Sequence, residues 1–275
     1  MRTGEERERN TGRAKRGGPA AKAFGWLAAV CLGTSLILSG CRDSEEERYN
    51  LRLQGIEQLR AGDCEEAIAS FEQALHTGSK GLVGEFELDL LKYRAQAEYE
   101  AGDYEAAAYT YEILLEADQE RREYRERACL LYAEAGQGDK AKEQYQKLYE
   151  SGKDDPETAR ILLRLGQTLT EQNRSDEAME LYEQAVNDGI KNGEIYNRMG
   201  VCRLEAGDYD EAIRYLEQGI GTGDVTAMKS LMINQAAAYE KKLDFARALS
   251  ILQQCAAAYG ATPEIEKEID FLKTR

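Results

Sequence analysis

The sequence predicts an all-α protein built from repeated helix-turn-helix units. Sequences of the Ala-Gly-Asp type recur along the chain, and each of six copies ends in an alanine, at intervals of 34 to 40 residues. A large residue follows each alanine four positions later, as expected for one face of a helix. Apolar residues at helical spacing flank every turn, whereas strand-like alternation is absent from the sequence. The alanines are Ala67, Ala107, Ala141, Ala178, Ala212 and Ala248.

The first 40 residues differ in composition from the rest of the chain. Residues 1–23 carry seven Lys or Arg residues against three Glu, and residues 24–38 form an uncharged apolar run. A helix needs roughly 18 to 20 apolar residues to span a bilayer, so this run is short for that purpose. Its length favours a signal segment, with an uncleaved signal anchor as the alternative.

The tetrad Leu38-Ser39-Gly40-Cys41 follows that run and resembles the lipobox of bacterial lipoproteins. The resemblance implies that residues 1–40 are a signal peptide, that the chain is cut before Cys41, and that Cys41 carries the lipid, including palmitate. Because positive charge stays cytoplasmic, the rest of the chain would be exported. We therefore expect an anchor on the outer face of the cytoplasmic membrane, or on the outer membrane if the host has two membranes.

Behind Cys41, the sequence divides into a tether, six units and a cap. Residues 41–47 are a short acidic tether, and residues 48–261 hold the six units, at about 48–81, 88–121, 122–155, 159–192, 193–226 and 229–261. Residues 262–275 form a capping helix, which begins at Thr262-Pro263 because proline is tolerated in the first turn. Between the first two units, segment 76–87 is longer than the other connections, and His76 is expected to end a helix.

Each unit has a small residue at the same place in its first helix, where this helix must approach its partner closely. A bulky side chain at that place would force the two helices apart. The six residues are Gly55, Ala95, Cys129, Gly166, Gly200 and Ala236.

The repeats resemble those of the tetratricopeptide repeat (TPR) family. The fourth unit carries the family pattern in Leu162, Leu165 and Gly166 of its first helix and in Ala178 and Tyr182 of its second. Arg203 departs from the pattern, and the repeat-closing proline is missing from nearly every unit. The resemblance implies a right-handed TPR solenoid of about six repeats, in which each unit buries its apolar face against its neighbours.

Composition argues against several functional classes. The chain has 36 basic and 51 acidic residues, and its formal charge of -15 would repel nucleic acid. With His76 as the only histidine and no Cys-x-x-Cys pair, most metal and acid-base sites lack their usual residues. We expect no catalytic site, no metal site and no cofactor beyond the lipid on Cys41. The other cysteines outside the signal segment, Cys64, Cys129, Cys202 and Cys255, are expected to be buried thiols.

A groove for a protein partner is expected on the inner surface, which the first helices form in this family. Its mixture of apolar and hydrogen-bonding side chains suits an extended or helical peptide segment. The candidate groove residues are Arg52, Ile56, Arg60, Lys92, Gln96, Tyr99, Arg160, Leu163, Gln167, Asn197 and Val201, with Leu59, Leu130 and Leu204 beside them.

The expected partner is an exported or envelope protein. Some family members bind a C-terminal carboxylate with a clamp of Lys and Asn, which stand one helical turn apart. Here the residue one turn after Lys92 is Gln96, and the residue one turn after Arg52 is Ile56. That clamp is therefore not carried over, whereas Arg52, Arg60 and Lys92 favour an acidic partner segment. The leading interpretation is a non-catalytic, membrane-anchored scaffold. The alternatives are a component of an envelope-assembly or cell-wall enzyme regulatory complex and, third, an enzyme.

Overall fold

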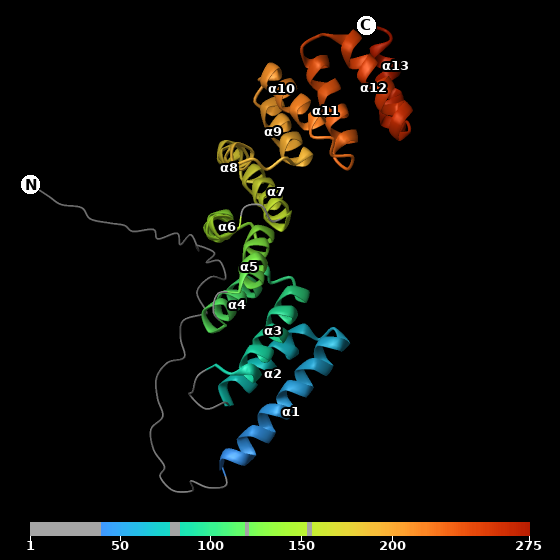
Figure 1. The fold of residues 1–275 in the computed structure, drawn as a ribbon. Coiled ribbons are helices and arrows are strands. Elements are labelled where there is room, and N and C mark those ends of the chain that lie inside the picture. Colours follow the sequence, from blue (N-terminus) through green and yellow to red (C-terminus); the bar gives the residue numbers. More distant parts are fainter. Residues whose placement is uncertain (1–39, 78–82, 119–120, 153–155) are drawn as a thin grey trace, which may run out of the picture. The chain divides into compact units, whose positions relative to one another are not determined.

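The computed structural model describes residues 40–77, 83–118, 121–152 and 156–275 (Figure 1). Within these ranges the chain forms thirteen α-helices and no strand, so the predicted all-α class is confirmed. The predicted signal segment, including Leu38 and Ser39, and the side chain of Cys41 lie outside the described part. Among the described helices, none is long and apolar enough to cross a bilayer.

The helices follow one another as six pairs and a final single helix. The first five are α1 (Gly40–Ala61), α2 (Cys64–Thr77), α3 (Glu85–Glu100), α4 (Tyr104–Ala117) and α5 (Arg122–Glu134). The next four are α6 (Gly138–Ser151), α7 (Pro156–Glu171), α8 (Ser175–Asn187) and α9 (Gly193–Glu205). The last four are α10 (Tyr209–Gly221), α11 (Met228–Lys241), α12 (Phe245–Tyr259) and α13 (Pro263–Leu272).

From the third pair to the sixth, the first helices of successive pairs lie against one another as well as against their own partners. Contacts join α5 to α7, α7 to α9, and α9 to α11. Side chains on the free faces of these helices can therefore form one surface. Helix α1 begins at Gly40, so the segment 42–47, expected as a tether, is helical. Its glutamates are good helix formers.

A residue in the left-handed region of backbone conformation follows the first helix of every pair. Gly62 has φ of 88° and Gly207 has φ of 78°, a region that glycine enters without steric cost. Asn173 takes this place in the fourth pair with φ of 61°, and Leu243 takes it in the sixth with φ of 63°. An aspartate then caps several second helices; the Asp103 carboxylate, for example, accepts a hydrogen bond from the Ala106 amide at 3.0 Å.

The six small residues lie at the closest approach of the paired helices, as predicted. A Cβ atom added to Gly55 would stand 2.6 Å from the Phe71 ring, and one added to Gly166 would stand 1.9 Å from the Tyr182 hydroxyl. Gly200 meets Leu216 in the same way, at 2.6 Å. Ala95, Cys129 and Ala236 are buried, and all six repeat alanines are fully buried: Ala67, Ala107, Ala141, Ala178, Ala212 and Ala248.

The core is divided into successive clusters along the chain. The largest runs from Ala107 to Tyr215, and separate clusters cover the first two pairs and the last two. The predicted capping helix is confirmed as α13: Thr262 caps it, Pro263 stands in its first turn, and Ile265 and Leu272 are buried.

The predicted burial of the thiols is confirmed for three of the four cysteines. Cys129, Cys202 and Cys255 are buried, whereas Cys64 is half-buried. Burial raises the pKa of the Cys129 thiol to about 12, so this sulfur stays protonated and packs as a small apolar group. His76 lies in the last turn of α2, as expected, and its Nδ1 is 2.8 Å from the Glu72 carbonyl oxygen.

Polar contacts also tie neighbouring pairs together. Glu98 is 2% exposed, and its carboxylate accepts hydrogen bonds from Arg94 and Thr110, both at 2.7 Å. Arg94 also reaches Glu72 on α2 at 3.2 Å. Burial raises the pKa of Glu98 even though Thr110 and Arg94 favour its charged form. The first and second pairs therefore share a charged network, which runs from the partly exposed Glu72 to the buried Glu98.

Replacing Leu243 by glycine is expected to stabilise the protein. A non-glycine residue in the left-handed region lowers the stability by about 1 to 3 kcal/mol, and glycine would remove this cost. Because glycine has greater freedom in the unfolded chain, roughly 0.5 to 1 kcal/mol of the resulting gain is lost again. Leu243 is 73% exposed, so little packing is lost. Urea denaturation followed by circular dichroism should show a gain of about 1 kcal/mol. The reciprocal Gly207→Leu should lose a similar amount, and an unchanged L243G would contradict the argument.

Replacing Gly166 by alanine is expected to lower the free energy of unfolding by about 1 to 3 kcal/mol, because the new methyl group overlaps the buried Tyr182 ring. In the sixth pair the corresponding residue is already an alanine. Ala236 lies there in the same core cluster as Leu252 of α12, a leucine in place of the tyrosine. Tyr182→Leu should therefore cost less in the G166A background than alone. Strictly additive effects in this double-mutant cycle would refute direct contact between the two positions.

Candidate functional site

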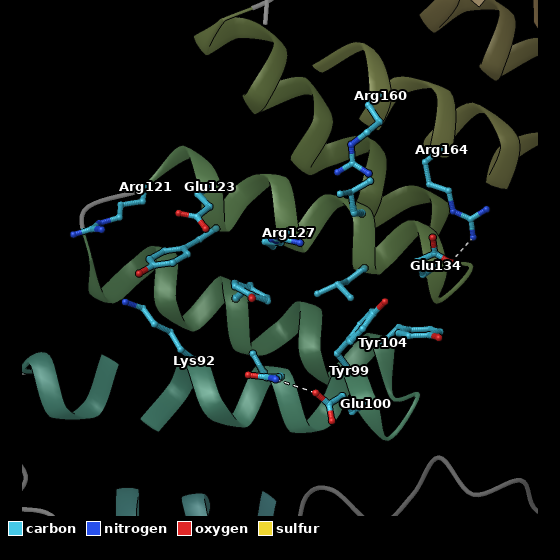
Figure 2. A pocket seen from close by; sticks show the side chains of 16 residues that line it. Lys92, Tyr99, Glu100, Tyr104, Arg121, Glu123, Arg127, Glu134, Arg160 and Arg164 are labelled. Carbon is cyan, nitrogen blue, oxygen red and sulfur yellow. Dashed lines mark hydrogen bonds and ion pairs between the residues drawn. The ribbon is translucent and has the colours of Figure 1, made fainter. Parts of the chain in front are cut away.

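A pocket of about 850 Å³ opens where the first helices of the second, third and fourth pairs meet (Figure 2). We call it the α3/α5/α7 pocket; its remaining residues are Tyr104 and Tyr111 of α4 and Arg121, just before α5. Helical spacing explains how α3 contributes. Lys92, Gln96 and Tyr99 stand at i, i+4 and i+7 and therefore share one face.

Positive charge predominates in the lining of this pocket, although the chain as a whole is acidic. Three carboxylates also line it: Glu100, Glu123 and Glu134. The basic side chains number five: Lys92, Arg121, Arg127, Arg160 and Arg164. Arginine stays protonated at any physiological pH, so most of this positive charge is fixed.

Three of the five basic side chains already have carboxylate partners. Arg121 pairs with Asp118 at 2.7 Å, and Arg164 pairs with Glu134 at 2.7 Å. Arg160 donates to Glu157, one turn earlier on its own helix, and this hydrogen bond raises the pKa of its guanidinium.

The other two, Lys92 and Arg127, have no carboxylate partner in the described part of the chain. The Lys92 ammonium group lies over the ring of Tyr124, 5.8 Å from its centre, a weak cation-π contact. Arg127 is exposed and directed into the middle of the pocket (Figure 2). Of the five basic side chains of the pocket, these two are therefore the ones available to pair with a ligand.

Aromatic rings form one end of the pocket. Tyr99 and Tyr104 lie with ring centres 5.6 Å apart, and Tyr99 is 53% exposed. Figure 2 shows this pair at the end opposite Lys92. Apolar side chains from α5, Leu130 and Leu131, continue the wall. The pocket thus combines an unpaired positive region with an aromatic region, an arrangement suited to binding.

Four residues predicted for the groove line this pocket: Lys92, Gln96, Tyr99 and Arg160. Leu130, placed beside them from the sequence, lines it as well. The amide nitrogen of Gln96 donates to Glu100 at 2.9 Å.

Other predicted groove residues make contacts within the fold instead. Arg52 binds Asp89 on α3 at 2.5 Å, and this hydrogen bond raises its pKa. Ile56 and Leu163 pack against core clusters. Asn197 is 5% exposed and accepts a hydrogen bond from Asn234 on α11 at 2.8 Å, which joins the fifth and sixth pairs.

The remaining three predicted residues also lie outside this pocket. Gln167 on α7 donates to Glu171 at 2.8 Å. Arg60 is exposed near the end of α1, and Val201 is half-buried on α9. The structure therefore brings the predicted residues from Lys92 to Arg160 together in one pocket. The predicted residues before Lys92 and after Arg160 in the sequence lie outside it.

Sequence reasoning missed several pocket residues, chiefly those of α5. Only Leu130 was assigned from the third unit, although Arg127 and Glu134 stand three positions before and four after it, on the same helical face. That spacing could have identified both. The missed residues that carry charge or an aromatic ring are Glu100, Tyr104, Tyr111, Arg121, Glu123, Tyr124, Arg127, Glu134 and Arg164.

Solved structures with a similar chain path include several repeat proteins. One is a tetratricopeptide repeat protein from Parabacteroides merdae, with 18% identity, 82% of this chain and 84% of that chain covered, and a TM-score of 0.40. Another is the TPR2AB-domain:pHSP90 complex of yeast Sti1, with 18% identity, coverages of 83% and 99%, and a TM-score of 0.39. MamA gives 19% identity, coverages of 64% and 96%, and a TM-score of 0.49.

Family profiles give the assignment. No curated protein sequence matches the chain. Three profiles described as tetratricopeptide repeat match residues 52–121, 124–188 and 169–232, which include nearly all of the helix pairs from the first to the fifth. With the paired helices, the small residues at their contacts and the capping helix already in place, these matches show that the chain belongs to the tetratricopeptide repeat family.

Proposed function

We propose that this protein is a non-catalytic, membrane-anchored scaffold, which holds an exported or envelope protein in the cell envelope through the α3/α5/α7 pocket. Repeats of this family serve protein-protein interaction, and that general role is supported by the profile matches. The single observation that carries the choice of site is the pocket itself, which holds two unpaired basic groups and, at the end opposite Lys92, the ring pair of Tyr99 and Tyr104.

The pocket favours a peptide segment over a small metabolite. It is open along three neighbouring helices, and its lining mixes charge, amide and aromatic groups as peptide-binding surfaces do. Its arginines supply hydrogen-bond donors and fixed charge rather than proton transfer. A bound segment would lie across helices of three repeats, so the rigidity of their packing would orient the partner.

The anchoring part of the proposal is supported by the sequence around Cys41. The basic stretch, the short apolar run and Leu38-Ser39-Gly40-Cys41 together match what lipid attachment requires. A single acyl chain holds a protein only marginally, and lipoproteins carry more than one, which is enough for stable attachment. The acidic chain gains nothing from anionic lipid, so the anchoring would be hydrophobic.

Crosslinking from the membranes of a bacterial host that expresses the full chain tests the scaffold. A variant with Lys92→Ala, Gln96→Ala and Arg160→Ala should lose one defined partner, because all three side chains line the pocket. The matched control changes Tyr109 and Val225 to alanine, which are 57% and 76% exposed and lie outside it. A partner retained by the pocket variant would exclude this pocket as the working surface.

Changing Cys41 to alanine tests the anchor. We expect the protein to leave the membrane fraction and to lose incorporation of a clickable palmitate analogue, because the thiol is the only proposed site of acylation. Cys64→Ala serves as the control, since Cys64 is half-buried in the first helix pair. Membrane retention and lipid labelling in the Cys41 variant would disprove lipid anchoring at this residue.

A further inference from the structure

We propose that the occupant of the α3/α5/α7 pocket is an internal, extended acidic segment that carries one apolar side chain close to its acidic residue. This inference rests on the proposed scaffold function and specifies the partner. It depends on where the unpaired charges lie, which differs from the expectation based on Arg52, Arg60 and Lys92.

The first argument is the distribution of free positive charge. Near the N-terminal end of the protein, Arg48 and Arg52 are already neutralised by Glu87 and Asp89 on α3. Lys92 and Arg127, on the neighbouring helices α3 and α5, have no such partner among the described residues. Two such basic groups therefore line one pocket, whereas Arg60 at the end of α1 is a single exposed charge.

The second argument is the contrast between the pocket and the whole molecule. The protein has a formal charge of -15, so an acidic segment is repelled by most of its surface. Within about 10 Å, the screening length at ordinary salt, an acidic side chain between Lys92 and Arg127 would meet two basic groups that no described carboxylate pairs with. An acidic segment is thus attracted at this pocket and repelled by the rest of the surface, so it binds selectively at the pocket.

The third argument fixes the spacing within the segment. Lys92 and Tyr99 are seven residues apart on α3, about 10 Å along the helix axis. An extended peptide covers that distance in about three residues. An acidic residue held between Lys92 and Arg127 would therefore place an apolar residue, three positions away, against Tyr99 and Tyr104 (Figure 2).

The fourth argument favours an internal segment over a chain end. The residue one turn after Lys92 is Gln96, whose amide nitrogen is held by Glu100 at 2.9 Å. The pocket thus has one basic side chain on each of two helices, an arrangement suited to the side-chain carboxylates of a peptide. It has no Lys and Asn pair one turn apart, which would bind a terminal carboxylate. Binding should accordingly survive when both ends of the segment are blocked.

Selection from synthetic dodecapeptides with acetylated and amidated ends tests the inference. The full chain, purified from membranes in uncharged detergent, is the bait. Selected peptides should carry net negative charge, with Asp or Glu about three positions from Phe, Tyr or Leu, and affinity should fall at least about 5-fold between 50 mM and 500 mM salt. Neutral or basic selected peptides, or a requirement for a free C-terminus, would overturn the inference and leave the scaffold proposal standing.

Charge reversal at two positions locates the site. Lys92→Glu with Arg127→Glu should weaken the best acidic peptide about 10-fold or more, since two exposed ion pairs are lost and repulsion replaces them. The control with Lys191→Glu and Lys267→Glu has the same net charge, and both lysines are exposed outside the pocket. Lys92→Arg with Arg127→Lys keeps the charge and should keep binding.

Equal weakening in the two charge-reversed proteins would overturn the inference, because it would show a general effect of net charge. Failure to select any peptide would overturn it too, whereas the scaffold function is judged separately by the crosslinked partner. Circular dichroism of each variant guards against unfolding, and Lys92 and Arg127 are exposed side chains whose replacement removes no core packing.

Discussion

The close approach of two helices within each repeat is the constraint on which the rest of the structure depends. At Gly166 and Gly200 a single added carbon would overlap the facing side chain, and at Gly55 it would overlap the Phe71 ring. Close packing of this kind sets the separation of the paired helices, and a fixed separation gives every repeat the same width. Repeats of equal width can stack, which brings α3, α5 and α7 together and so forms the pocket.

Sequence periodicity predicted the fold well because the relevant signals are local. An alanine that is fully buried in all six repeats, a small residue at each close approach, and a Gly-Asp turn all lie within a single helix pair, so their spacing can be recognised directly. The turn signal was weaker in the fourth and sixth pairs, where Asn173 and Leu243 occupy the left-handed position. The early start of α1 was missed because an acidic run resembles a solvated spacer as much as a helix start.

The candidate site was less predictable because it depends on contacts between repeats. Arg52 and Lys92 look equivalent in sequence, yet Asp89 neutralises only the former. Asn197 is polar and was expected in the groove, but Asn234 lies within hydrogen-bond distance, 37 residues later. Which side chain finds a partner in the next repeat cannot be derived from periodicity, since it depends on the detailed offset of neighbouring pairs. The ion pair of Arg94 with Glu72 on α2 has the same origin.

The division of the core into successive clusters has a consequence for how such a chain can change over evolutionary time. Because each cluster is closed mainly by its neighbours along the chain, duplication or loss of one helix pair alters only the contacts at the junction and leaves distant clusters as they were. The α3/α5/α7 pocket lies where the cluster around Tyr124 meets the one around Leu131. A binding surface at such a junction can be lengthened, shortened or recombined in whole units, so partner choice can diverge while the fold persists.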